Sequence, residues 1–198
     1  MRAANLVTAV TLLCCPLVAR AADAGVVDAP HVRAELVAEH AALTPGENWV
    51  ALRLAPEPGW HTYHREPGDT GLPTAMVWSL PPGYAAGEIQ WPAPETFRHG
   101  NETSYGYSRE TLHLVRISVP ASAAGGQATL GTQASWLVCK DLCVPGRARL
   151  TLTLPVRAAR GAPGPWAAAF AAMRQRLPQP GAPQYLMRAL RSTPAGRL

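Results

Sequence analysis

Cys139 and Cys143 are the residues of this chain whose type and spacing could carry chemistry. Three residues, Lys140, Asp141 and Leu142, separate them. A close thiol pair can cycle between dithiol and disulfide, and its thiolate can attack a disulfide in another protein through a mixed disulfide. We therefore interpret this pair as a candidate redox site.

Two predicted strands would position the pair. Residues 128–138 are typical of a strand, and residues 147–154 alternate leucine with polar side chains. The cysteines would then stand at the two shoulders of a tight hairpin. Paired strand ends can supply the Cα separation of about 4.4–6.8 Å that a disulfide needs. The spacing therefore allows a disulfide between Cys139 and Cys143.

The residues alone leave the role of this pair open. A lone cysteine pair in an exported protein is more often a structural disulfide than a catalytic one. However, a disulfide that closes a loop with three intervening residues constrains the unfolded chain little, so it would stabilise the fold only weakly. Lys140 would favour a thiolate and Asp141 would oppose it. A zinc site would have only half of its ligands, because no histidine follows Cys143 at finger-like spacing.

The first 21 residues predict a secretory signal peptide. Residues 6–18 form an apolar run, and Ala19-Arg20-Ala21 is a small-residue cleavage pattern. A run of about 13 residues is short for a membrane anchor, and no later apolar run is long enough to cross a bilayer. Cleavage would remove Cys14 and Cys15, so we expect a periplasmic protein with two cysteines in an oxidising compartment.

Charge argues against two classes of partner. The chain has 18 basic and 13 acidic residues, and loss of Arg2 and Arg20 with the signal leaves a net charge of about +3. The arginines are scattered along the chain rather than gathered in a block. This pattern predicts neither nucleic-acid binding nor membrane-surface binding.

The rest of the chain predicts an all-β sandwich with a short C-terminal helix. The start of the mature chain is expected to be flexible, and residues 95–110 are expected to form an irregular polar loop. Residues 166–177 carry apolar side chains at helical spacing, and prolines follow them. Further strands are expected at residues 31–40, 49–54, 59–64, 74–80, 87–91 and 111–119. We divide the chain into a signal peptide (1–21), a sandwich domain (22–156), and a linker, short helix and flexible tail (157–198).

Two other features invite a functional interpretation. His61 and His64 lie three residues apart, which on a strand places them on opposite faces, so a packing role is favoured over a shared metal site. Tyr105, Gly106 and Tyr107 stand in the polar loop as a possible lid, although packing at the rim of the sandwich is the simpler role. No glycine-rich phosphate loop, paired carboxylates or serine nucleophile motif accompanies them.

Several motifs, in order along residues 32–156, resemble the N-terminal periplasmic domain of the thiol:disulfide interchange protein DsbD and its relative ScsB. They are residues 59–63 (GWHTY), 67–73 (PGDTGLP), 89–94 (IQWPAP), 105–107 (YGY) and 136–146 (WLVCKDLCVPG). The resemblance implies an immunoglobulin-like sandwich whose Cys139/Cys143 pair carries electrons. It further implies that Cys143 forms mixed disulfides, that Cys139 resolves them, and that the segment from Tyr105 to Tyr107 caps the site.

The resemblance also implies partners. These are thioredoxin-like periplasmic proteins, with no cofactor needed for the exchange itself. DsbD has a longer gap between its cysteines, and its cap has a phenylalanine where this chain has Ser104. Full family members continue into a membrane domain and a thioredoxin-like domain, whereas this sequence ends at Leu198, so a separate membrane electron donor is expected. The rival hypothesis is a non-enzymatic sandwich that binds a protein or copper and uses the cysteines as a structural clip.

Overall fold

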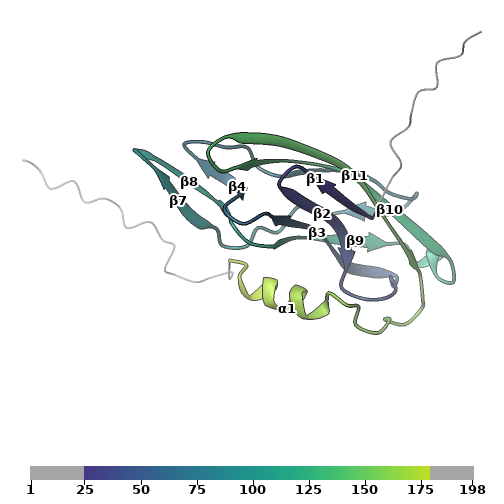
Figure 1. Ribbon diagram of the computed structural model, residues 1–198. Coiled ribbons are helices and arrows are strands. Elements are labelled where there is room, and N and C mark those ends of the chain that lie inside the picture. Colours follow the sequence, from purple (N-terminus) through teal and green to yellow (C-terminus); the bar gives the residue numbers. More distant parts are fainter. Residues whose placement is uncertain (1–24, 179–198) are drawn as a thin grey trace, which may run out of the picture.

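Two antiparallel sheets packed face to face, with one helix outside them, make up the protein (Figure 1). The computed structural model describes residues 25–178. The first sheet has the order β1 (Val26–Ala29), β2 (Val32–Ala38), β3 (Gly46–Pro56), β9 (Thr111–Val119), β6 (Ala85–Ala86). The second has the order β11 (Cys143–Pro155), β10 (Gln127–Cys139), β4 (His61–Gly68), β8 (Glu102–Tyr107), β7 (Glu95–His99), and β5 (Ala75–Ser79) also pairs with β10. The predicted all-β sandwich is confirmed.

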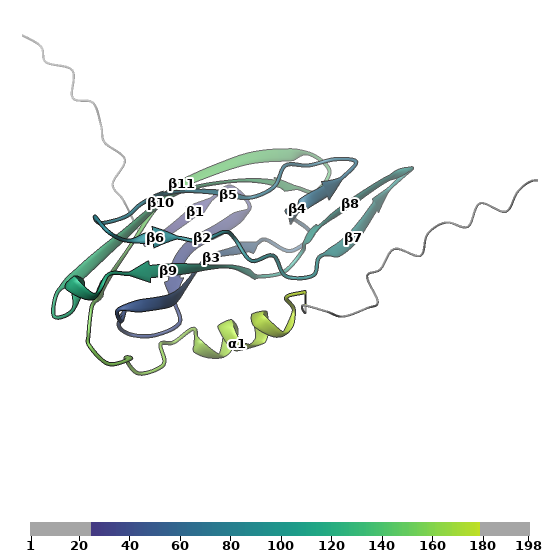
Figure 2. The same ribbon diagram turned by 180° about the vertical axis from the view of Figure 1, so that it is seen from behind.

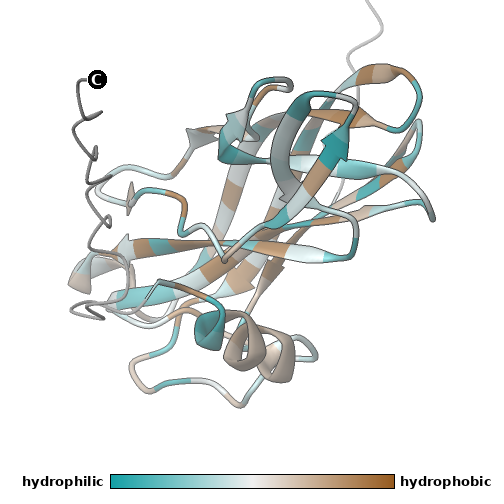
Figure 3. Cartoon of the chain, turned by 90° about the vertical axis from the view of Figure 1, so that its left-hand side faces the viewer, coloured by the Kyte–Doolittle hydropathy of each residue, from teal (hydrophilic) through white to brown (hydrophobic). Residues whose placement is uncertain are grey.

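The core lies between the sheets and follows the alternation of the sequence. Val50, Leu52 and Leu54 of β3 are fully buried, and so are Leu130 and Ala134 of β10. Successive side chains of a strand point to opposite faces, so every second residue enters the core. Figure 3 shows this as bands of hydrophobic and hydrophilic residues along the strands. Removal of this apolar surface from water is the main force that joins the sheets.

The helix α1 (Ala167–Gln175) covers the outer face of the first sheet (Figure 2). Its buried residues Phe170 and Met173 pack against Leu112 and Leu114 of β9. This contact explains why β9 is apolar on both faces: one side faces the second sheet and the other faces the helix. Among residues 25–178, no helix is long and apolar enough to cross a membrane.

Three local predictions were wrong. The expected flexible start contains β1, which pairs with β2. Residues 95–110 are no irregular loop, because β7 and β8 form a hairpin there that projects from one end of the molecule (Figure 1). Residues 87–91 form no strand: only Gln90 makes a bridge, to Leu114. The prolines that follow limit further pairing in this last segment, because proline lacks an amide donor.

Candidate functional site

The cysteine pair closes the end of the β10–β11 hairpin. The two strands pair without interruption from Gln127 and Pro155 up to Cys139 and Cys143. The two sulfurs form a disulfide with an S–S distance of 2.02 Å and a Cα separation of 4.1 Å. In the turn, the amide of Lys140 donates to the carbonyl of Leu142. The hairpin predicted from the sequence is present, and the disulfide that its spacing allowed is formed.

The two cysteines differ in exposure. Cys139 is only 2% exposed, because β11 flanks it on one side and β4 on the other. Cys143 belongs to the exposed residues, and Leu142 beside it is 61% exposed. Cys143 is therefore the more accessible residue of the pair.

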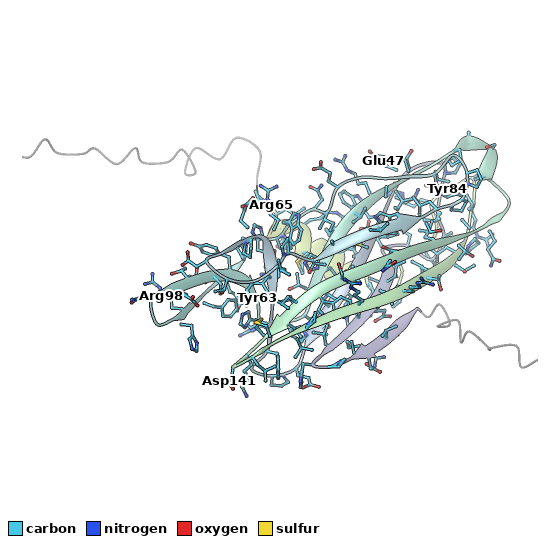
Figure 4. All side chains as sticks on the ribbon, turned by 90° about the horizontal axis from the view of Figure 1, so that it is seen from above. Glu47, Tyr63, Arg65, Tyr84, Arg98 and Asp141 are labelled. Carbon is cyan, nitrogen blue, oxygen red and sulfur yellow. A yellow bond between two sulfur atoms is a disulfide. The ribbon has the colours of Figure 1, made fainter. Side chains whose placement is uncertain are left out.

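The disulfide lies on the outer face of the second sheet. Val138 and Thr62 pair with each other and are both fully buried toward the core. Their neighbours Cys139 and His61, which also pair, must then point to the opposite face. Tyr63 shares that face with His61. Figure 4 shows Tyr63 beside the disulfide and Asp141 at the hairpin tip.

Aromatic rings surround the sulfurs on this face. The ring of His61 stacks on Phe97 of β7, with centroids 4.2 Å apart, and meets the edge of Tyr63 at 5.1 Å. The hydroxyl oxygen of Tyr63 lies 4.0 Å from Sγ of Cys143. A sulfur in a disulfide has no proton, so the hydroxyl is the donor in this weak contact.

Burial sets the protonation of the two rings. Desolvation lowers the pKa of His61, and the carboxylate of Glu95 partly opposes this. Desolvation also raises the pKa of Tyr63, against a hydrogen bond with Thr70. At neutral pH His61 is therefore neutral, and Tyr63 keeps the proton that it directs toward Cys143.

The 69–73 loop covers Tyr63. Asp69 fastens this loop to β8, since its amide donates to the carbonyl of Thr103 and its carboxylate accepts from the amide of Thr103. Gly71 has a φ of +100°, and a Cβ at this position would lie 2.2 Å from the Tyr63 ring. Only glycine satisfies both conditions, so this loop can rest directly on the ring.

The expected cap residues lie in β8. Tyr107 is fully buried, and its hydroxyl donates to the carbonyl of Pro92. Gly106 pairs with Tyr63, and a Cβ on it would strike the backbone of Thr62. Tyr105 is 37% exposed. A capping role for these three residues stays a prediction.

Phe97 of β7 provides a further aromatic ring at the site. It pairs with Ser104 across the β7–β8 hairpin. This ring reaches the site through its stack on His61.

His64 and His113 do not join the site. His64 contacts the rings of Trp91 and Tyr107 on the core side, so it lies on the face opposite His61, as its spacing predicts. His113 is fully buried between the same two rings. Within residues 25–178, no group of three or more histidine, cysteine or acidic residues is arranged to hold a metal ion.

The fold and the site together define an all-β sandwich with an asymmetrically exposed hairpin disulfide. Residues 33–155 match the family model described as thiol:disulfide interchange protein DsbD, N-terminal. The chain belongs to this family.

A solved structure supports the same fold. The N-terminal periplasmic domain of ScsB from Proteus mirabilis matches with a TM-score of 0.55 and 21% sequence identity, over 79% of this chain and 59% of that one. The present chain thus spans less than two thirds of that structure. No curated protein matches the sequence.

Sequence reasoning missed part of the site. His61 was assigned to packing, and Tyr63 and Gly71 were quoted only as parts of motifs. Alternation along residues 59–63 could have placed His61 and Tyr63 on one face. Phe97 could not be found in this way, because its segment was expected to be irregular.

Proposed function

We propose that this domain is a periplasmic thiol–disulfide exchange module that carries electrons through Cys139 and Cys143. The observation that supports this most strongly is the unequal exposure of the two cysteine residues. A structural clip has no need for an open sulfur beside a buried one. An exchanging pair does, because one thiolate must reach the partner while the other must be sheltered from it.

The exchange has two steps. The thiolate of Cys143 attacks a disulfide in the partner, so a mixed disulfide forms and one partner thiolate leaves. Cys139 then attacks Cys143, which closes the disulfide seen here and releases the second partner thiolate. The Tyr63 hydroxyl near Cys143 stabilises the attacking thiolate, because a hydrogen bond to the charged form favours it.

Membership of the DsbD N-terminal family supports this assignment and is the basis for a proposal about the partners. We propose thioredoxin-like periplasmic proteins as exchange partners and a membrane-embedded thiol–disulfide carrier as electron donor. Docking would use the hairpin tip, where Leu142 is exposed, and the nearby 69–73 loop, where Leu72 is 63% exposed. Exposed apolar side chains around a reactive group are typical of a protein-docking surface.

Trapping of the mixed disulfide tests this function. Cys139→Ser leaves the exposed sulfur without its neighbour, so incubation with glutathione disulfide should load one glutathione on each chain, as measured by mass spectrometry. Cys143→Ser is the matched control and should react more slowly, by at least about tenfold, because the remaining sulfur is buried. Equal or absent loading of the two variants would instead favour the structural clip.

A further inference from the structure

The Nε2 atom of His61 is buried and has no hydrogen-bond partner among the described residues. Buried side-chain nitrogens normally have a partner, so this atom calls for an explanation. His61 stands directly opposite Cys139, where side chains on one face lie about 4.5–5.5 Å apart at Cβ. In the disulfide, the sulfur of Cys139 has no proton to donate. Reduction to the dithiol would provide a proton donor on the residue directly opposite His61.

We propose that His61, through Nε2, is the base that takes the thiol proton of Cys139 when the mixed disulfide is resolved. This inference rests on the exchange function proposed above. It gives a chemical role to a side chain that the sequence assigned only to packing.

Resolution of the mixed disulfide begins at Cys139. The Cys139 thiol transfers its proton to Nε2, and the resulting thiolate attacks Sγ of Cys143. The Cys139–Cys143 bond forms as the bond between Cys143 and the partner sulfur breaks. That sulfur leaves as a thiolate and takes a proton from the imidazolium or from water. In sum, two electrons pass from the cysteine pair to the partner's disulfide.

The burial of Cys139 makes an internal base useful. At 2% exposure its thiol has little contact with water, which disfavours a thiolate and hinders removal of the proton by hydroxide. Desolvation keeps His61 neutral at neutral pH, so its nitrogen lone pair is free to accept. The stack on Phe97 holds the plane of the imidazole ring.

The charged and titratable groups around His61 come from several elements. Glu95 of β7 raises the pKa of His61 and would stabilise the imidazolium that forms. Tyr63 is on the same strand, Cys143 is on β11, and Lys140 lies in the adjacent turn with its side chain against Gly59. Of these, Glu95 is the group that favours proton uptake by His61.

A two-phase thiol assay tests the proposal. The reduced protein is mixed in stopped flow with one equivalent of 5,5′-dithiobis(2-nitrobenzoate), whose thiolate product is coloured. The first equivalent of colour reports attack by Cys143, and the second reports resolution by Cys139. Both rates are followed from pH 5 to pH 9 in the wild type and in His61→Gln, with His99→Gln, at an exposed position, as the matched control.

With His61 as base, the resolution rate of the wild type should stay nearly constant between the pKa of the histidine and that of the thiol. This is because transfer of the proton from the Cys139 thiol to the His61 imidazole neither takes up nor releases a proton to the solvent. In His61→Gln the second phase should instead fall about tenfold per pH unit below the thiol pKa, while the first phase stays unchanged. His99→Gln should behave as the wild type.

The outcomes separate this inference from the function on which it rests. An intact first phase with the same pH profile for resolution in His61→Gln and wild type overturns the role of His61 alone. The absence of a first phase in the wild type overturns the exchange function, and the His61 proposal with it. If His61→Gln fails to fold, the wild type still decides: the ¹⁵N signal of His61 Nε2 should shift on reduction of the disulfide, and no shift overturns the proposal.

Discussion

At the scale of single residues, the two cysteines differ in solvent exposure, which the amino-acid type alone does not reveal. The sequence predicted the pair, its hairpin and the possibility of a disulfide from strand alternation and a three-residue gap. It could not predict which sulfur is open, because the shelter over Cys139 comes from β4, whose residues lie far away in the chain. Only tertiary pairing brings His61 opposite Cys139.

His113 provides a test of burial in the core. It is fully buried, and desolvation lowers its pKa to about 4, with a smaller opposing contribution from the backbone of Leu52. An unfolded histidine has a pKa of about 6.5, so between pH 6.5 and pH 4 the unfolded chain binds more protons. The contribution of His113 to the free energy of unfolding should therefore be fully present above about pH 6.5. It should decrease by roughly 3 kcal/mol as the pH falls toward 4.

The replacement His113→Phe should reduce the decrease in the free energy of unfolding at low pH. Urea unfolding at pH 7.5 and pH 4.8 gives the free energy of unfolding of each variant. His61 and His64, whose pKa values burial also lowers, should leave a smaller loss of the same sign. His99→Gln, at an exposed position, should retain the pH dependence of the wild type. An unchanged slope in His113→Phe would refute this account of the buried ring.

At the scale of elements, the β7–β8 hairpin shows where sequence reasoning reached its limit. Polar residues on both faces hid the strand alternation of residues 95–110, so the segment was expected to be a loop. The strands project from the end of the sandwich, and much of their surface is exposed. The glycine and asparagine at 100–101 were the available signal, since such a pair is typical of a tight hairpin turn.

The 69–73 loop gives a prediction at this scale. Gly71→Ala should destabilise the protein, because alanine disfavours the positive φ and its Cβ would displace the Tyr63 ring. The matched control is Gly46→Ala, which has a similar φ of +94° but no atom within 4 Å of the added carbon. Urea unfolding should show a loss that exceeds the control by at least about 1 kcal/mol.

The same pair of variants reports on the shelter of the disulfide. Displacement of the 69–73 loop should shift the Tyr63 ring, whose hydroxyl lies 4.0 Å from Sγ of Cys143. Dithiothreitol should therefore reduce the disulfide faster in Gly71→Ala than in Gly46→Ala or the wild type. Equal stability and equal reduction rates for the two variants would show that this loop does not rest on Tyr63 in solution.

At the scale of the whole molecule, the helix and the disulfide lie on opposite outer faces. The helix packs on the first sheet, and the disulfide lies on the second. A bidentate salt bridge between Arg174 of the helix and Glu39 also holds the helix in place. The hydrogen bonds from Arg174 lower the pKa of the Glu39 carboxyl. Strand alternation predicted the sandwich and helical spacing predicted the helix. Neither pattern predicted that the helix would cover β9.

Truncation of the helix core tests this separation. Phe170→Ala should reduce the free energy of unfolding by about 3–5 kcal/mol, because it leaves a cavity in a fully buried contact. The rate of glutathione loading at Cys143 should not change, since distant sites act independently. Gln175→Ala, at an exposed position of the same helix, should alter neither quantity. A slower exchange in Phe170→Ala that remains folded would contradict the separation.

The reduction potential of the Cys139–Cys143 pair tests the central claim most directly. The protein is equilibrated in thiol buffers of defined potential, and the fraction of free thiol is measured by alkylation and mass spectrometry. An exchanging disulfide should have a potential above about −300 mV, within reach of periplasmic thiol–disulfide partners. A value well below that limit would identify the bond as a structural clip and contradict the account.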